Sequence, residues 1–278
     1  RSALRKKMKE RQREQQERPE GGGGNFFHSY IKADALKKMG LPWFKKIPEG
    51  TLTFDLIPFQ VSEKFLINPQ THRADYIPDE YYFVLDLKVH KGVGPNNWDV
   101  VCPAAHLGRH CPVCQMAKDA KAKIDGQNKE EWKAKVLPFL PKERNVMLIW
   151  IHDKDGVEEE KGPQLLEISY HSLMKQIKEL AVDEDSGETV EYASVEDDGK
   201  RISFKRKGTG MKNTQFLGYK FIDRDEGLSD DILDHEFYLN EVIEILDEDQ
   251  LQELVDGMKA AAKDNDDDDD DDRPRKRR

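Results

Sequence analysis

Apolar and polar residues alternate in a series of short runs that indicate β-strands. At least six or seven runs qualify, and the clearest are residues 51–57, 82–89, 98–101, 145–151, 165–170, 202–208 and 215–221. Three further segments are predicted to be helices instead, namely 112–124, 129–136 and 172–181. Many short strands with a few inserted helices favour a mainly β fold, and we expect a Greek-key β-barrel of the oligonucleotide-binding (OB) class.

Two pairs of these strands are predicted to form hairpins. Residues 82–89 and 98–101 flank a turn at 92–97 that is rich in Gly, Pro and Asn. The run from Ile202 to Phe221 alternates around a Gly-containing turn in the same way. Successive side chains of a strand point to opposite faces of the sheet. One face of the second hairpin would therefore enter a core, while the other presents Lys205, Lys207 and Lys212.

The two ends of the chain differ from its middle. Residues 1–24 form a polar, basic segment that closes with four glycines, which predicts a flexible arm and hinge. An acidic helical segment is expected at 226–262, where Asp247 begins a helix with an apolar stripe of Leu251, Leu254, Val255 and Met258. Residues 263–278 hold seven consecutive aspartates and a basic end, and we expect a disordered tail. The OB-fold core would then span 25–225.

Composition limits the class of protein. Of the 278 residues, 37% are hydrophobic and 36% are charged, as in a soluble protein with a modest core. No apolar run is long enough to span a membrane and the start is not signal-like, so the expected compartment is reducing and cytosolic.

The net charge of −10 conceals a segregation of charge along the chain. Residues 1–18 carry eight Lys or Arg against three Glu, and residues 201–222 carry six Lys or Arg and no acid. Most other acidic residues lie in 153–200 and 223–259. Basic residues gathered in this way favour the binding of a polyanion on one face, with a chance run on a solvated face as the alternative.

Cations interleaved with aromatic residues on a sheet are typical of proteins that bind single-stranded nucleic acid, because phosphates follow the positive charge and bases stack on rings. Tyr82 and Trp98 are the stacking candidates, although aromatic residues in strands more often belong to a core. Phosphate contacts are expected from Lys88, Lys91, Arg109, Lys142, Arg144, Lys205, Arg206, Lys207 and Lys212.

All three cysteines lie within thirteen residues, and with one histidine they form the pattern H-x11-C-x8-C-x2-C. The turn Cys111-Pro-Val-Cys114 can direct two thiolates at one tetrahedral ion, with Cys102 as a third ligand, so the pattern predicts zinc. A redox dithiol or a pair of buried free thiols is the alternative. Four protein ligands leave no open position, and such a zinc site is structural rather than catalytic.

The fourth ligand remains open between three histidines. The first hairpin would bring His90 opposite Cys102 across the ladder, which favours His90. His106 and His110 stay as alternatives, since His106 follows Cys102 by four residues and His110 adjoins Cys111.

The order of these parts resembles the gene-32-type single-stranded DNA-binding proteins of tailed bacteriophages. The resemblance covers roughly residues 45–225 and rests on a strand ending in His90, a Gly/Lys/Asn turn, a strand ending in Cys102, and the segment C-P-V-C-Q from Cys111 to Gln115 that opens a helix. It implies a zinc-containing OB fold that binds single-stranded DNA without sequence preference. The implied role is to protect and organise that DNA in phage replication, recombination and repair.

The same resemblance carries further expectations. It implies a zinc subdomain at about 84–125, a basic arm that contacts other copies along the DNA, and an acidic C-terminal region that recruits replication proteins. It also implies a location in the cytoplasm of the infected bacterial host, with no membrane partner. The chain departs from the family pattern in its four-glycine hinge and in the basic residues that follow the aspartates.

Two other classes of protein fit parts of the pattern. A zinc-containing replication or transcription adaptor would bind protein partners rather than DNA. A zinc nuclease or polymerase-associated factor would need carboxylates at metal-binding spacing near the basic face, whereas Asp153 and Asp155 lie in a predicted loop. We therefore expect a binding protein and not an enzyme.

Overall fold

The computed structural model describes residues 29–63, 76–77, 79–124, 128–182, 187–233 and 236–268, without the side chains of 211, 212, 231 and 261–268. The predicted N-terminal arm and the chain beyond Asp268 lie outside these described residues. None of the helices in the described part is long and apolar enough to cross a membrane.

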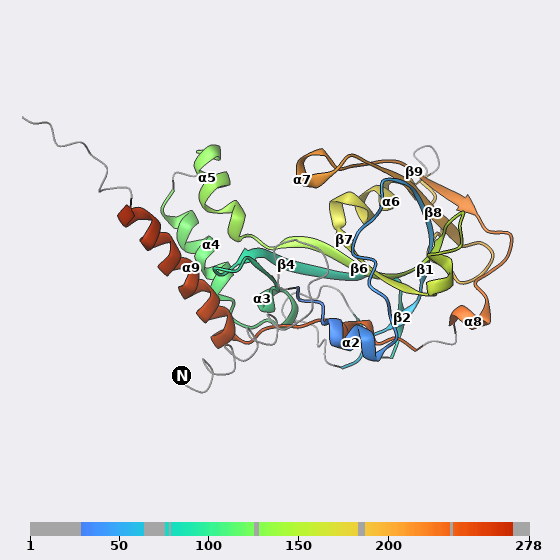
Figure 1. Cartoon of the computed structure of the whole chain (residues 1–278), viewed down its shortest axis with the longest axis horizontal. Helices are drawn as coiled ribbons and strands as arrows, with labels where there is room; N and C mark the ends of the chain where they lie inside the picture. Colours follow the sequence, from blue (N-terminus) through green and yellow to red (C-terminus); the bar gives the residue numbers. More distant parts are fainter. Residues whose placement is uncertain are drawn as a thin grey trace, which may run out of the picture.

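A seven-stranded antiparallel sheet forms the body of the molecule (Figure 1). Its strands follow the order β5, β4, β6, β1, β8, β9, and β7 pairs with β6 as a branch. The strands are β1 (Gly50–Ile57), β4 (Leu85–Val93), β5 (Trp98–Val101), β6 (Lys142–His152), β7 (Gln164–Ser169), β8 (Lys200–Lys207) and β9 (Gln215–Asp223). A separate pair joins β2 (Phe59–Gln60) to β3 (Tyr81–Tyr82).

The long strand β6 organises the sheet because three other strands pair with it. β4 pairs with its first half, β1 with its second half, and β7 along its middle. Alternate side chains of β6 therefore enter two different cores. Val146 and Leu148 belong to a cluster shared with β4, whereas Met147 and Ile149 belong to a cluster shared with β1 and β8.

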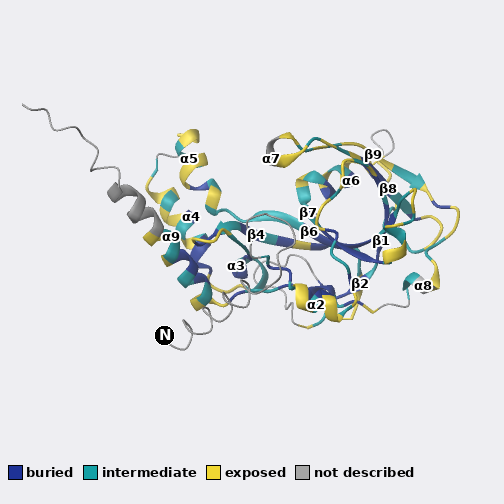
Figure 2. Ribbon diagram, viewed as in Figure 1, coloured by how far each residue is buried: buried dark blue, intermediate teal, exposed yellow. Residues whose placement is uncertain are grey.

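Helices cover both cores. α2 (Ala33–Lys38) and the short helix η4 (Leu239–Val242) pack on the first cluster, and α6 (Met174–Leu180) packs on the second. Figure 2 shows buried residues running along β6 and β1 in the middle of the molecule. The smaller helices α7 (Gly210–Asn213) and α8 (Asp230–Leu233) follow β8 and β9.

A third hydrophobic cluster lies at the end of the molecule remote from β8 and β9 (Figure 1). It joins the β4–β5 hairpin to two helices, α4 (Pro112–Ala122) and α9 (Glu248–Asp268). α3 (Pro103–Leu107) and α5 (Lys129–Lys135) lie beside it.

The predicted mainly β fold with inserted helices is confirmed, and every predicted strand and helix is present within a few residues. The OB class remains a prediction. Three details differ from expectation. The first hairpin places His90 opposite Val100, so that Cys102 is a diagonal neighbour. The helix α9 continues to Asp268, into the segment expected to be a disordered tail from residue 263. Short elements such as α2, β2 and α3 were not predicted, because they span too few residues to show a periodicity.

Candidate metal centre and nucleic-acid interface

The structure brings together the four residues of the H-x11-C-x8-C-x2-C pattern. His90 lies on β4, Cys102 and Cys111 immediately precede α3 and α4, and Cys114 lies in the first turn of α4. Their ligand atoms all lie within 4.8 Å of one another. Three separate backbone segments thus converge on one point, which makes these residues a candidate metal site.

The spacing of the ligand atoms fits a tetrahedral zinc ion. Cys102 Sγ lies 3.5 Å from Cys114 Sγ, and His90 Nε2 lies 3.4 Å from Cys111 Sγ and 3.5 Å from Cys114 Sγ. Zinc bonds of about 2.3 Å to sulfur and about 2.0 Å to nitrogen imply tetrahedral edges of roughly 3.5–3.8 Å. These three separations are therefore close to those that a tetrahedral zinc ion requires, and three thiolates with one imidazole form a ligand set that zinc commonly takes.

The orientation of His90 is set by a hydrogen bond behind the metal centre. Its Nδ1 lies 2.9 Å from the carbonyl oxygen of Phe139, so Nδ1 carries the proton and donates it. The lone pair of Nε2 then faces the three sulfurs. Such a second hydrogen bond is typical of histidine ligands, because it fixes the tautomer that can bind metal.

Cys111 is the sulfur that loses its proton most readily. Hydrogen bonds from the thiols of Cys102 and Cys114 lower the pKa of Cys111. Metal binding requires thiolates, so the cluster already favours the first deprotonation step.

The other two candidate histidines have different partners. His106 Nε2 accepts a hydrogen bond of 2.8 Å from the backbone N–H of Lys88, and burial lowers the pKa of His106 to about 4. His110 Nδ1 lies 2.9 Å from Glu248 Oε1 at the start of α9. Within the described chain, His90 is the ring that joins the three cysteines.

Lys205 and Lys207 lie on the exposed face of β8, while Phe204, which precedes them in the strand, is fully buried. Neither lysine forms an ion pair with a carboxylate in the part of the chain that the structure describes. Lys220 on β9 lies opposite Ser203 and adds a third exposed cation to this hairpin. Their positive charge is therefore available to an external anion.

Arg206 lies between these two lysines in sequence but on the other face of the strand, where its Nη2 donates to Thr214 Oγ1 at 3.3 Å. Three successive cations of one strand thus cannot all meet the same stretch of nucleic acid. The backbone of Lys212 belongs to α7, and its side chain lies outside the described residues.

Several of the other predicted phosphate contacts are already neutralised. Each of the following forms an ion pair with a carboxylate: Lys88 with Glu143, Lys91 with Asp99, and Arg144 with Glu167. Lys142 Nζ donates to the carbonyl oxygen of Leu137 at 3.0 Å. Arg109 is exposed in the loop before α4.

The two predicted stacking residues are partly buried in different clusters. Trp98 packs against the third cluster, next to the candidate metal site. Tyr82 packs against the first cluster, where its ring meets Tyr76 edge-on and its hydroxyl accepts the N–H of Ile77. The structure therefore does not bring them together with each other or with the β8–β9 hairpin.

Most members of a group of partly buried aromatic residues at the rim of the second cluster were missed by the sequence reasoning. Its members from four segments are Phe83, Tyr170, Tyr192, Phe216, Tyr219 and Phe221. Lys178 Nζ lies 5.5 Å from the ring centroid of Tyr170, so cation and ring already meet at this rim. The alternation in β9 was the available signal for three of them. Tyr170 begins a short 3-10 helix, Tyr170–Ser172, and Phe83 and Tyr192 lie outside regular elements.

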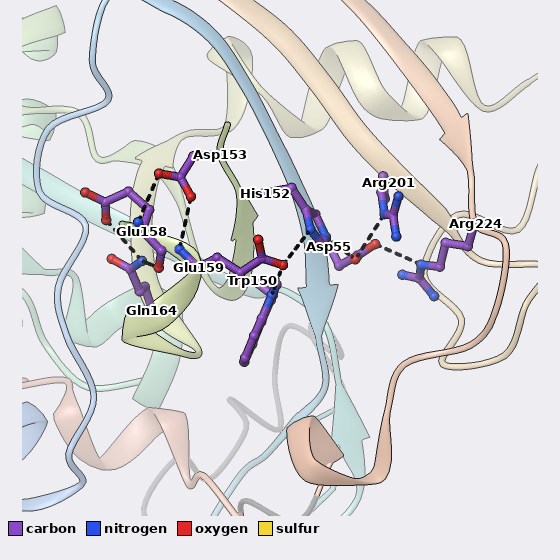
Figure 3. A network of polar contacts seen from close by, with 9 residues as sticks. All are labelled: Asp55, Trp150, His152, Asp153, Glu158, Glu159, Gln164, Arg201 and Arg224. Carbon is purple, nitrogen blue, oxygen red and sulfur yellow. Dashed lines mark hydrogen bonds and ion pairs between the residues drawn. The ribbon is translucent and has the colours of Figure 1, made fainter. Parts of the chain in front are cut away.

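A buried polar network ties β1, β6 and β8 to the segment after β9 (Figure 3). Asp55 accepts hydrogen bonds of 2.8 Å from Arg224 Nε and 2.7 Å from His152 Nε2, and Arg201 Nε lies 3.6 Å away. Burial alone would raise the pKa of Asp55, but its hydrogen bonds with His152 and Arg224 outweigh burial and lower it. Arg224 also donates to the carbonyl oxygen of Ser194, which fixes the acidic loop before β8.

Comparison with known protein families gives a match for the chain. A family model described as "gp32 DNA binding protein like" matches residues 54–261, which include the candidate metal site, the β8–β9 hairpin and most of the described part of α9. No curated protein matches the chain.

Proposed function

Because the chain belongs to the gp32 DNA binding protein like family, we propose that it is a sequence-nonspecific single-stranded DNA-binding protein. The family match over residues 54–261 is the observation that carries this proposal. We also propose that the protein protects and organises single-stranded DNA in phage replication, recombination and repair, in the cytoplasm of the infected host. On this view it is a binding protein without enzymatic activity, built on an OB fold.

The cations of the β8–β9 hairpin are our primary candidates for phosphate contacts. Lys205 and Lys207 are exposed and have no carboxylate partner in the described chain, so binding of a phosphate would not first require an ion pair to break. Lys88, Lys91 and Arg144 would have to exchange a carboxylate for a phosphate, and we expect them to contribute less. The aromatic rim beside Tyr170 and Phe216 supports stacking of unpaired bases.

Zinc is the proposed metal, and its role is structural. His90, Cys102, Cys111 and Cys114 would hold it, and the ion would fix the chain between β5 and α4. This stretch has few apolar residues of its own, so metal bonds replace hydrophobic contacts there.

The charged ends of the chain are proposed to act together. The basic arm at 1–24 would contact other copies along the DNA, and the acidic C-terminal region would recruit replication proteins. The aspartate run would compete with DNA for the basic surface when DNA is absent.

A fluorescence anisotropy titration with labelled oligo(dT) tests DNA binding directly. We expect binding of the single strand that is much tighter than binding of a duplex of equal length, and that weakens with salt. Each phosphate neutralised on a single strand contributes about 0.7 log units per log unit of salt. Replacing Lys205 and Lys207 by Ala should therefore lower the salt slope by up to about 1.4 for every DNA sequence alike.

A matched control removes two exposed lysines elsewhere, Lys37 and Lys38 on α2, and should leave the slope unchanged. Equal affinity for duplex and single strand would contradict the proposal. Absence of DNA binding by a folded, zinc-loaded protein would favour the zinc-containing adaptor that binds protein partners.

A further inference from the structure

The C-terminal helix α9 is built into the same hydrophobic cluster as the candidate metal ligands. Leu251, Leu254 and Val255 of α9 are buried together with Cys102 and Cys111. Figure 1 shows α9 running alongside α4, the helix that carries Cys114. We propose that the docking of α9 and the binding of metal are coupled, so that loss of the metal releases α9 from the body of the protein.

The contact between α9 and the metal-bearing segment is close on two sides. A Cβ added at Gly94, in the β4–β5 turn, would lie 2.8 Å from Leu254 Cδ2, and one added at Gly257 would lie 3.0 Å from Pro95 Cδ. The helix and the hairpin turn therefore approach more closely than side chains would allow. Such a fit depends on the turn keeping its position.

The start of α9 also meets the loop between the first and second cysteines, Cys102 and Cys111. His110, next to Cys111, lies 2.9 Å from Glu248 Oε1. Both side chains are about half exposed, so this pair adds little free energy. It does place the first turn of α9 against the ligand loop itself.

The docking surface for α9 consists largely of residues that the metal holds in place. Val113 is buried between two of the ligands in sequence, and Met116 follows on the next turn of α4. The stretch from Cys102 to Cys114 contains one short helix and few hydrophobic residues, so without metal it lacks the interactions that fix the start of α4. Since coupling between two binding events is reciprocal, α9 must in turn strengthen metal binding.

The coupling would also position negative charge. The backbone of α9 is helical as far as Asp268, and its last turns carry Asp264, Asp266 and Asp267. A docked α9 holds these aspartates at one end of the molecule, whereas a released α9 would let them move over the length of the tether. The inference does not rest on DNA binding and can be tested without DNA.

Hydrogen exchange measured by mass spectrometry on the full chain tests the release of α9. With zinc bound, peptides covering residues 248–260 should exchange slowly. After removal of zinc with a chelator, these peptides and those covering α4 should lose most of their protection, while peptides covering β1 and β8 keep theirs. Unchanged protection of α9, or an equal loss over the whole chain, would overturn the proposal.

The reciprocal effect is tested by measuring zinc affinity in competition with a chromophoric chelator. Leu254→Ala removes a buried side chain of α9 that is not itself one of the four candidate metal ligands. We expect the zinc affinity of this variant to fall about tenfold or more. Ile177→Ala makes a comparable cavity in the second cluster and serves as the control. Equal zinc affinity in the two variants would overturn the coupling. Zinc-dependent protection of α9 measured in Ile177→Ala keeps the test valid if Leu254→Ala fails to fold.

Discussion

Replacing Arg224 by Met should destabilise the protein strongly, because it leaves Asp55 buried without its closest cation. The side chains of Arg224 and Asp55 are 1% and 4% exposed, and Arg224 Nε lies 2.8 Å from Asp55 Oδ1. Charge centres about 4 Å apart attract by roughly 4 kcal/mol at an effective dielectric constant of 20. Breaking a buried pair from one side costs about 3–5 kcal/mol.

The other neighbours of Asp55 place the expected loss of stability at the lower end of the range of about 3–5 kcal/mol. His152 still donates to Asp55 Oδ2, and Arg201 lies 3.6 Å from the same oxygen. Arg224→Met also removes the hydrogen bond to the carbonyl oxygen of Ser194. We therefore expect a loss of about 3 kcal/mol in the free energy of unfolding, or roughly 6–12 °C in Tm for a folded unit of about 200 residues.

The destabilisation caused by Arg224→Met should depend on pH, because Asp55 must be ionised for the ion pair to form. The pKa of Asp55 is lowered in the folded protein, so its stabilising contribution is complete above the unfolded pKa and is lost as the pH falls through the folded pKa. The difference between wild type and Arg224→Met should thus be full at pH 7 and should shrink once the pH falls below about 4.

Urea unfolding at pH 7 and at a pH below about 4 measures these differences in the free energy of unfolding. Lys200→Met is the matched control, because it removes an ion pair with Asp223 whose carboxylate is largely exposed, and should cost less than about 1 kcal/mol. A loss in Arg224→Met no greater than in the control, or an equal loss at both pH values, would refute the reasoning.

Four further outcomes are expected. Cys111→Ser should lower both the zinc content, measured by mass spectrometry of metals, and Tm; full zinc content at an unchanged Tm would remove the metal assignment. Glu143→Gln frees Lys88 from its ion pair and should tighten oligo(dT) binding at low salt. Phe216→Ala should weaken oligo(dT) binding by about 1–3 kcal/mol if this ring stacks on a base, and unchanged affinity would exclude it. Deletion of 264–278 should tighten DNA binding at low salt but not at high salt; no change would show that the aspartates do not compete for the DNA surface.

The sequence by itself determined those features that depend on near neighbours in the chain. Side-chain alternation located the strands and placed Lys205 and Lys207 on the face opposite Phe204, because a strand imposes a period of two on its residues. The spacing of Cys102, Cys111 and Cys114 indicated the metal site, since a tetrahedral ion limits how its ligands can be spaced. The apolar stripe of α9 was visible in the same way.

Only the tertiary structure decided which charges remain free and which surfaces meet. Lys88 and Arg144 form ion pairs with Glu143 and Glu167, which lie on other strands, and a linear pattern contains no information about such partners. Asp55 and Arg224 are separated by 169 residues and meet because the sheet brings β1 and the end of β9 together. The stripe of α9 could have packed on any apolar surface. Its place beside the metal ligands follows from the fit of Leu254 against the glycine turn, a property of the folded surface and not of either segment alone.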